Sequence, residues 1–221
     1  MDIAEEKPKP TRNSEATRQR ILQAATQEFA RKGFDGARID DIARQANANK
    51  QMLYHYFGNK DDLFTKVLED AYQALRQHEA EVDLDKLPAN EAILALLEST
   101  WRHYLDNPEL IRLLAAENQM EARHLKANNS FQGINDAHVK RMKDLLERGQ
   151  REGNVRAGID PMQINISMAA LGFFYLSNRF TLATVYDCNL LSRKSLQERL
   201  RVMKETIACW VQPCCFFKMI A

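Results

Sequence analysis

The chain has 221 residues, 45% of them hydrophobic, so either one large domain or two small ones can bury a core. The 31 Lys and Arg residues almost balance the 30 Asp and Glu residues, which excludes a protein that binds nucleic acid through bulk positive charge. With only 8 Gly and 6 Pro, a turn-rich all-β fold is also excluded, and a mainly helical chain is expected.

The positive charge is concentrated near the N-terminus. Residues 1–60 hold 11 Lys and Arg against 8 Asp and Glu, whereas the remainder holds 20 against 22. Residues 1–13 contain Lys7, Lys9 and Arg12 and cannot bury a core, so we expect a flexible basic arm there. This arm either enters a minor groove of DNA or remains free in solvent.

Two helices are expected after the arm. The apolar residues from Ile21 to Phe29 recur with helical spacing, which predicts a helix from about Ser14. Gly33 suits the end of this helix, because a C-terminal cap favours a residue that can adopt positive φ. A second, shorter helix is expected over residues 38–46.

A tight turn and a third helix follow. Asn47 tolerates the left-handed conformation that a turn requires, and Asn49 is a strong N-cap for the helix over residues 50–57. Leu53 and Phe57 are four residues apart and should face the core. The outer face then lacks acidic residues and carries groups that can donate hydrogen bonds to phosphates or base edges. Its members are Lys50, Gln51, Tyr54 and His55.

A short helix, a three-residue turn and a second short helix form the arrangement that lays a recognition helix in the major groove. Over residues 17–66 this chain closely resembles the N-terminal domain of the TetR family of bacterial transcriptional regulators. The residues that carry the resemblance are Gly33-Phe34, Ile42-Ala43, Ala46, Leu53-Tyr54-His55-Tyr56-Phe57, Lys60 and Leu63. The resemblance implies an all-α fold, with a three-helix DNA-binding head followed by a ligand-binding and dimerisation domain of about six helices.

Two positions depart from the pattern of many relatives. Ala37-Arg38 stands where they have Thr, and Asn47-Ala48-Asn49 stands where they have Gly-Val-Ser. Asn can replace Gly in a turn and Ser as a cap, and Arg38 can contact a phosphate in place of a hydroxyl group. The base preference of a relative therefore cannot be transferred to this chain.

The candidate DNA-binding residues combine the outer face of the third helix with its flanks. By resemblance, Tyr54 and Lys60 are expected to contact phosphates. Lys60 follows Asn59, which is expected to cap the next helix, so free backbone N–H groups there would add to the anion site. Which of the groove-facing side chains reaches a base stays open. The complete set is Arg38, Lys50, Gln51, Met52, Tyr54, His55 and Lys60.

The expected domains are the arm (1–13), the DNA-binding domain (14–60), an effector-binding and dimerisation domain (61–211) and a C-terminal tail (212–221). Six helices are expected in the second domain, from their apolar periodicity and from Pro and Gly breaks. A capping box of Ser195 and Glu198 is expected to begin the last of them. The six cover about 59–82, 89–106, 108–125, 134–152, 160–185 and 195–211.

Residues 161–178 form the longest stretch without a charged side chain, yet polar residues such as Gln163 and Asn165 argue against a membrane span. Apolar residues on more than one face predict a helix buried on several sides. The resemblance implies that the last two helices pair with a second copy. Such a homodimer presents two recognition helices to a palindromic operator on double-stranded DNA.

Family members also commonly bind a small effector that releases the operator. Residues with apolar walls and a few polar groups are the candidates for this unidentified ligand, although the same residues could simply form the core. The candidates are Trp101, Tyr104, Leu105, Met120, Phe173, Phe174 and Asn178.

No catalytic residue, cofactor or metal is expected. Glu121-x-x-His124 has the spacing of a di-iron helix motif, but such sites need the motif twice and it occurs once. The acidic N-terminus and cysteine usage favour a cytoplasmic protein. We therefore expect a repressor released by a small ligand. The alternatives are an activator or a thiol-based redox regulator that uses Cys188, Cys209 or Cys214-Cys215.

Overall fold

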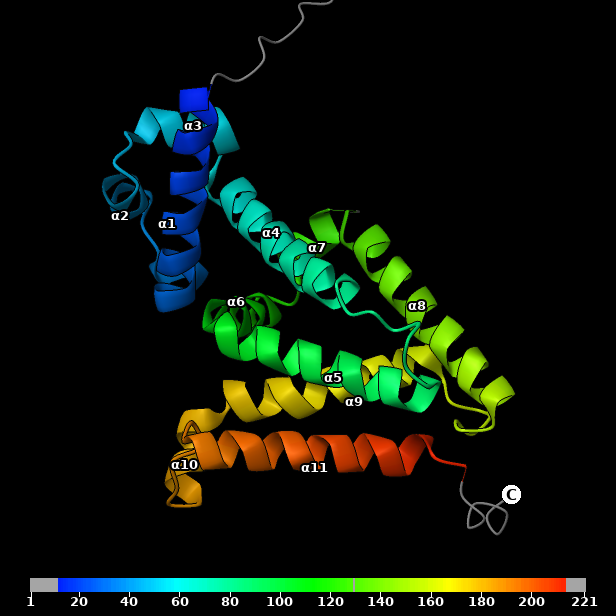
Figure 1. Cartoon of the computed structure of the whole chain (residues 1–221). Helices are drawn as coiled ribbons and strands as arrows, with labels where there is room; N and C mark the ends of the chain where they lie inside the picture. Colours follow the sequence, from blue (N-terminus) through cyan, green and yellow to red (C-terminus); the bar gives the residue numbers. More distant parts are fainter. Residues whose placement is uncertain (1–11, 129, 214–221) are drawn as a thin grey trace, which may run out of the picture. The chain divides into compact units, whose positions relative to one another are not determined.

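The computed structural model describes residues 12–128 and 130–213, which form helices and contain no strand (Figure 1). The expected all-α class is confirmed. The helices are α1 (Arg12–Gly36), α2 (Ile39–Gln45), α3 (Lys50–Phe57), α4 (Lys60–Ala80), α5 (Ala89–Asp106), α6 (Pro108–Gln119), α7 (Arg123–Ala127), α8 (Ser130–Glu152), α9 (Pro161–Ser177), α10 (Arg179–Val185) and α11 (Arg193–Val211).

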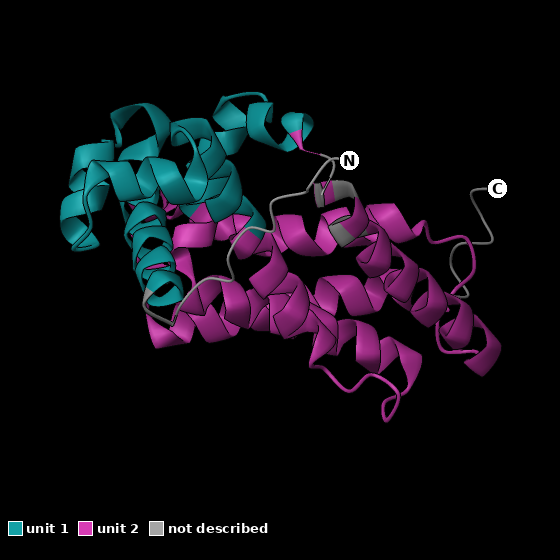
Figure 2. Cartoon of the chain, turned by 90° about the horizontal axis from the view of Figure 1, so that it is seen from above, with its two compact units in different colours: residues 1–69, 112–127 teal, residues 70–111, 128–221 magenta. Residues whose placement is uncertain are grey.

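The chain divides into two compact units (Figure 2). Unit 1 comprises residues 1–69 and 112–127, and unit 2 comprises residues 70–111 and 128–221. The chain passes between the units within α4, within α6 and directly after α7. Unit 1 is thus larger than the DNA-binding domain expected over residues 14–60, because α7 and parts of α4 and α6 belong to it. The functional boundary at residue 60 stays a prediction.

Unit 1 contains an aromatic core around α1 and α4. Phe29 and Phe64 are fully buried, with ring centroids 4.9 Å apart in an edge-on arrangement. Leu53 and Phe57 of α3 are also buried, as their spacing predicts. Burying each of these side chains contributes roughly 1.5–3 kcal/mol, so the inner face of α3 anchors the helix and its outer face is left to solvent.

The sharp changes of direction in unit 1 occur at the residues that the sequence indicates. Asn47 has a φ of 49°, the left-handed conformation expected in the turn. The side-chain oxygen of Asn49 accepts a hydrogen bond from the Met52 backbone N–H at 2.8 Å, which caps α3. The Asn59 side chain likewise accepts from the Asp62 N–H at 2.9 Å at the start of α4. These caps supply partners for backbone N–H groups that a helix start leaves unpaired.

Unit 2 is built around α5, which contacts α8, α9 and α11 (Figure 1). Gly172 of α9 lies against Trp101 and Tyr104 of α5. A Cβ atom at this position would lie 3.2 Å from a ring carbon of Tyr104 and 3.3 Å from one of Trp101. The absence of a side chain at Gly172 therefore allows α9 to pack closely on two aromatic rings.

The helix expected over residues 160–185 is two helices in the structure. Asp160 caps α9, because its carboxylate accepts from two N–H groups of the first turn. However, α9 ends at Ser177, and Asn178 separates it from α10. The Asn178 side chain donates to the Phe174 carbonyl, which satisfies one of the carbonyls at the end of α9. The prediction of one continuous helix was wrong.

The last helix begins earlier than expected. Ser192, not Ser195, is its N-cap, since the Ser192 hydroxyl accepts from the Ser195 N–H at 3.1 Å. The proposed capping box of Ser195 and Glu198 is therefore wrong by one turn. Within the described ranges, no helix is both long and apolar enough to cross a membrane.

The helix expected over residues 108–125 is also divided. Glu121 and Ala122 have φ values of 57° and 59°, so α6 ends before them and α7 begins after them. The Glu117 carboxylate compensates for the break by accepting from the backbone N–H groups of His124 and Leu125, at 2.7 and 3.0 Å. Glu121 and His124 consequently do not share one helix face, as a di-iron helix motif requires.

Candidate nucleic-acid interface

The outer face of α3 is exposed along its length. Lys50, Gln51, Tyr54 and His55 are exposed, as is Met52, which the buried Leu53 and Phe57 leave on the solvent side. Tyr54 is 47% exposed, so solvent reaches its ring. This face of α3 carries hydrogen-bond donors and no carboxylate, so it can approach the negative surface of DNA.

Lys50 is paired with an acidic residue of the preceding helix. Its ammonium nitrogen lies 3.1 Å from a carboxylate oxygen of Asp40, and this interaction raises the pKa of Lys50. Both side chains are more than half exposed, so water and salt weaken the pair. Asp40 thus lies beside the outer face of α3. It was not among the predicted site residues, because its partner is ten positions away on another helix.

Lys60 is held at the start of α4. Its ammonium nitrogen lies 4.7 Å from the centre of the Phe34 ring and 3.4 Å from the Asp35 carbonyl oxygen, to which it donates. The half-buried aliphatic stem and the ring contact restrict its motion. Lys60 is therefore a positioned cation rather than a freely moving one.

Arg38 occupies the N-cap position of α2 and is exposed, and its side chain does not cap the helix. Asp40 and Asp41 follow in the first turn, where carboxylates are favoured by the helix dipole. Arg38 is therefore an exposed cation two residues before Asp40, whose carboxylate pairs with Lys50.

A buried ionic network fastens α2 to α1, and sequence reasoning did not find it. Glu28 of α1 is buried and forms an ion pair with Lys32 at 2.6 Å, and Lys32 bonds in turn to Asp41 of α2 at 2.8 Å. Gln45 also donates to Glu28. Burial alone would raise the pKa of Glu28, but its bonds to Lys32, Arg31 and Gln45 lower it. The network fixes the helix that precedes the turn.

A second contact links α3 to the first turns of α1. The Tyr56 hydroxyl group lies 3.2 Å from the Ser14 hydroxyl oxygen, and the His55 and Tyr56 rings are 5.3 Å apart. Tyr56 is only partly exposed, so it supports α3 from beside the core. Three contacts therefore fix the position of α3: the Asn49 cap, its buried apolar face and the hydrogen bond of Tyr56.

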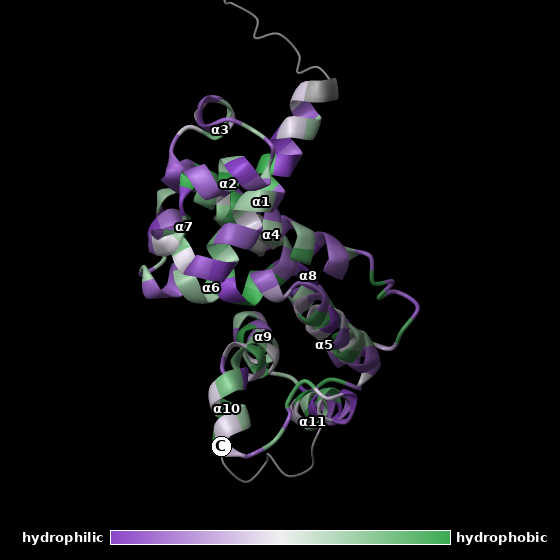
Figure 3. Cartoon of the chain, turned by 90° about the vertical axis from the view of Figure 1, so that its left-hand side faces the viewer, coloured by the Kyte–Doolittle hydropathy of each residue, from purple (hydrophilic) through white to green (hydrophobic). Residues whose placement is uncertain are grey.

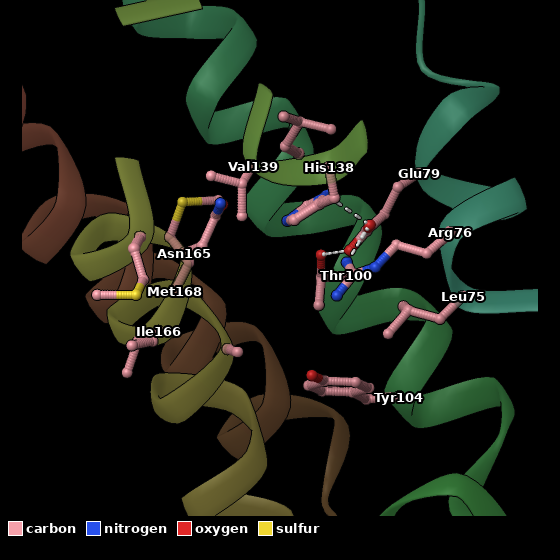
Figure 4. Close-up of a pocket in the computed structure, with 13 residues that line it drawn as sticks. Leu75, Arg76, Glu79, Thr100, Tyr104, His138, Val139, Asn165, Ile166 and Met168 are labelled. Carbon is pink, nitrogen blue, oxygen red and sulfur yellow. Dashed lines mark hydrogen bonds and ion pairs between the residues drawn. The ribbon is translucent and has the colours of Figure 1, made fainter. Parts of the chain in front are cut away.

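Unit 2 contains a cavity of about 360 Å³, which α4, α5, α8 and α9 surround (Figure 4). Of the predicted effector residues, only Tyr104 lines it. Trp101 is 2% exposed and packs on Tyr175, and Phe174 is 57% exposed on α9. Met120 belongs to unit 1. Leu105, Phe173 and Asn178 are half-buried and are not part of the cavity wall. As effector contacts, these residues stay a prediction.

The cavity has a charged cluster that the sequence analysis missed. The Glu79 carboxylate accepts from the Thr100 hydroxyl at 2.7 Å and from Arg76 at 2.6 Å, and lies 3.1 Å from the Nδ1 atom of His138 (Figure 4). Burial would raise the pKa of Glu79, but His138, Arg76 and Thr100 together lower it to about 2. The sequence did contain an indication of this cluster. Arg76 and Glu79 are three residues apart, so they lie on one face of the helix expected over 59–82, next to its apolar residues.

Within the described ranges, no group of three or more His, Cys, Asp or Glu residues could hold a metal ion. Cys188 and Cys209 are exposed free thiols. Cys214 and Cys215, the remaining candidates for a redox site, lie outside the described residues. The candidate sites that remain are the outer face of α3 and the cavity with the Glu79 cluster.

The fold and the exposed face of α3 together define a helix-turn-helix DNA-binding protein. Residues 21–67 match the model of the bacterial regulatory proteins of the tetR family, and residues 90–207 match that of the tetracyclin repressor-like C-terminal domain. The chain belongs to the TetR family of bacterial transcriptional regulators.

Relatives and solved structures agree with this assignment. The HTH-type transcriptional repressor NicS of Pseudomonas putida is 32% identical over 87% of this chain and 91% of its own length. The HTH-type transcriptional repressor SCO4008 of Streptomyces coelicolor is 36% identical over 72% of this chain and 78% of its own. The crystal structure of SCO4942 from Streptomyces coelicolor superposes with a TM-score of 0.68 at 26% identity, covering 88% of this chain and 98% of that one.

Proposed function

We propose that this protein is a homodimeric, cytoplasmic repressor that binds a palindromic operator and is released from it by a small-molecule effector. Members of its family are generally DNA-binding regulators rather than enzymes, and we propose no catalytic step. NicS and SCO4008 are named as repressors, which favours repression over activation for this chain. An activator of the same fold would use the same DNA-binding surface.

The observation that carries this proposal is the outer face of α3. It presents an ammonium, an amide, a phenol and an imidazole group on one exposed surface, while its inner face is anchored by Leu53 and Phe57. A bidentate amide–adenine or ammonium–guanine contact discriminates between base pairs by roughly 1–3 kcal/mol. We propose that Lys50, Gln51, Met52 and His55 face the bases, and that Arg38, Tyr54 and Lys60 contact phosphates.

Apolar surface on the last helices supports dimerisation. A groove of about 510 Å³ lies between α9 and α11, and apolar groups make up most of its wall. Phe174 and Trp210 contribute to it. On α10, Phe180 and Val185 are 70% and 69% exposed, and apolar residues appear green along this helix in Figure 3. Exposed apolar surface of this kind is typical of an interface, and we propose that a second copy covers it.

The effector is proposed to bind in the unit 2 cavity or at the predicted residues around α5 and α9. The 360 Å³ cavity falls within the range of small-molecule sites and combines apolar walls with a few polar groups. Release would follow if the ligand bound the DNA-free state more tightly than the DNA-bound state, because a ligand shifts an equilibrium only through such a difference.

Selection of duplexes from a random DNA library, at a stated near-physiological salt concentration, tests the proposal. We expect enrichment of a palindrome whose half-sites lie about 34–36 Å apart, one turn of B-DNA, or a multiple of that distance. Sedimentation of the protein with the selected duplex should give two chains per palindrome. Only salt-sensitive binding without sequence enrichment would contradict the proposal.

The thiol-based alternative is tested on the same duplex. Cys188 and Cys209 are exposed, so an oxidant can reach both. If a Cys188→Ser/Cys209→Ser variant and the native protein lose the same fraction of operator affinity after oxidation, neither of these two thiols acts as a sensor. Release by a small ligand under reducing conditions would favour the effector mechanism.

A further inference from the structure

The charged side chains that line the unit 2 cavity are paired with one another. Arg76 and His138 both contact the Glu79 carboxylate, at 2.6 and 3.1 Å, and Thr100 donates to its other oxygen. The backbone carbonyl of Glu79 accepts from Arg141 at 2.6 Å. A ligand with a net charge would therefore have to compete with the Arg76–Glu79 ion pair.

One neutral side chain of the cavity wall, Asn165, has polar atoms without partners. Both the Nδ2 and the Oδ1 atoms of Asn165 are buried and have no hydrogen-bond partner among the described residues. Burial raises the pKa of the Tyr104 hydroxyl to about 12, so this phenol remains protonated and neutral. Both residues line the cavity. An unpaired buried amide is costly, and buried polar groups in folded proteins are usually satisfied.

The rest of the wall is apolar. Leu75 of α4, Leu96 of α5, and Ile166 and Met168 of α9 line the cavity around these polar groups. Figure 4 shows Ile166 and Met168 on the same helix as Asn165, with the Glu79 cluster supplied by the facing helices. The Ile166 side chain is 53% exposed, so the cavity has an open, apolar rim. The body of a ligand in this cavity would contact hydrocarbon.

We infer that the effector is an uncharged, mainly apolar small molecule with one neutral group that offers a hydrogen-bond donor and an acceptor side by side, as a carboxamide does. The Asn165 amide pairs with that group, and Tyr104 supplies a further hydroxyl. This inference rests on the proposed role of the cavity as the effector site.

The geometry disfavours charged relatives of such a ligand. A carboxylate could satisfy only the donor of Asn165, and an ammonium group could satisfy only the acceptor. Either ion would also lose its hydration in the cavity, where the nearest charges, Glu79 and Arg76, are already paired with each other. A neutral carboxamide satisfies both atoms of the Asn165 side chain without adding a charge.

Three probes of equal length and different end groups test the inference on the full-length protein without DNA. They are hexanamide, hexanoate and hexylammonium, and their affinities are measured by NMR titration or calorimetry. We expect hexanamide to bind roughly three- to ten-fold more tightly than either ion, the factor that one net hydrogen bond supplies. Asn165→Leu should remove that advantage.

The Asn165→Leu variant should fold, since it replaces an unpaired buried amide with a side chain of similar volume, and its thermal unfolding midpoint should not fall. Gln163→Leu is the matched control, because it removes an exposed amide from the same helix. It should leave the preference for hexanamide intact. Hexanoate or hexylammonium binding as tightly as hexanamide would overturn the inference, as would an unchanged preference in Asn165→Leu.

Failure of this inference can be told apart from failure of the proposed function. If none of the three probes binds up to its solubility limit while a selected palindrome is bound, the amide site is wrong and the DNA-binding role stands. If hexanamide binds as expected but the random library yields no enriched sequence, the cavity chemistry stands and the proposed function is wrong.

Discussion

The polar groups of α3 and those of the unit 2 cavity differ in what satisfies them. Tyr54 and its neighbours on α3 are exposed, so water satisfies their donors at little cost while DNA is absent. The polar groups of the cavity are shielded from water, so Glu79 needs three partners and the unpaired Asn165 amide stands out. A binding role for an exposed donor is therefore inferred from its charge and its position. A binding role for a buried polar group is inferred from whether it has a hydrogen-bond partner.

Replacing Glu79 should have the largest effect on folding. In Glu79→Gln the neutral amide cannot balance the Arg76 charge, and removal of one member of a buried ion pair costs about 3 kcal/mol or more of unfolding free energy. Urea unfolding at neutral pH measures this loss. Glu81→Gln, which changes an exposed carboxylate one residue beyond the same helix, should have little effect. Equal stability of the two variants would contradict the role given to the Glu79 cluster.

The same carboxylate predicts a pH dependence. Its pKa is lowered from 4.5 to about 2 in the folded protein, so its contribution is present above pH 4.5 and is lost as the pH falls toward 2. The difference corresponds to roughly 3 kcal/mol. Between these pH values, the native protein should therefore lose more stability than Glu79→Gln. Parallel acid-dependence curves for the two proteins would show that another group controls this range.

In the proposed DNA-binding surface, Lys60→Met should weaken DNA binding by about tenfold for every sequence. The variant keeps the apolar stem near Phe34 but removes the charge that a phosphate would meet, so the slope of log affinity against log salt should become shallower by about one. Fluorescence anisotropy over a salt series measures both effects. Lys86→Met, on the exposed surface of unit 2, is the control. An unchanged salt slope in Lys60→Met would remove Lys60 from the phosphate contacts.

The cap of α3 should have a smaller effect, on the helix that carries the exposed donors. Asn49→Ala removes the bond to the Met52 N–H and should cost about 1 kcal/mol, seen as faster hydrogen exchange of the α3 amides. Asn49→Ser retains a capping oxygen and should exchange nearly as the native protein does. If Ser and Ala behave alike at this position, the cap contributes little to the stability of α3.

The smallest expected effect is a gain. Asp40→Asn removes an exposed anion and releases Lys50, so DNA affinity should rise by roughly two- to five-fold at low salt, and less at high salt. The change is measured on the selected duplex. A loss of affinity would mean that Asp40 instead positions Lys50 for a base contact. Asp83→Asn, an exposed acidic residue of unit 2, should leave DNA affinity unchanged.

The features found correctly from the sequence depend on neighbours within a few residues. Asn47, Asn49 and Asn59 were identified because turns and caps are local and because Asn suits each of them. The division at Asn178 was missed, since the apolar pattern continues through it without Pro or Gly. The break after Gln119 was also missed, because it depends on Glu117 bonding to N–H groups beyond the break.

The cavity was harder to predict than α3. Aromatic residues were chosen for it, but Trp101 fills the core, and of the chosen residues only Tyr104 reaches the cavity wall. The Glu79 cluster joins residues of α4, α5 and α8 that are far apart in the sequence. The apolar periodicity within one helix gives no information about contacts between different helices. The pair of Lys50 and Asp40 was missed for the same reason.

The claim that α3 reads the operator is tested most directly by selecting duplexes with the native protein and with Gln51→Ala side by side. Gln51 is exposed, and its replacement should leave the inner face of α3 unchanged. The account predicts that the native protein enriches a palindrome and that Gln51→Ala enriches the same spacing with a relaxed base preference at one symmetric pair of positions. Identical base preferences from both proteins, or no enriched sequence with the native protein, would contradict it.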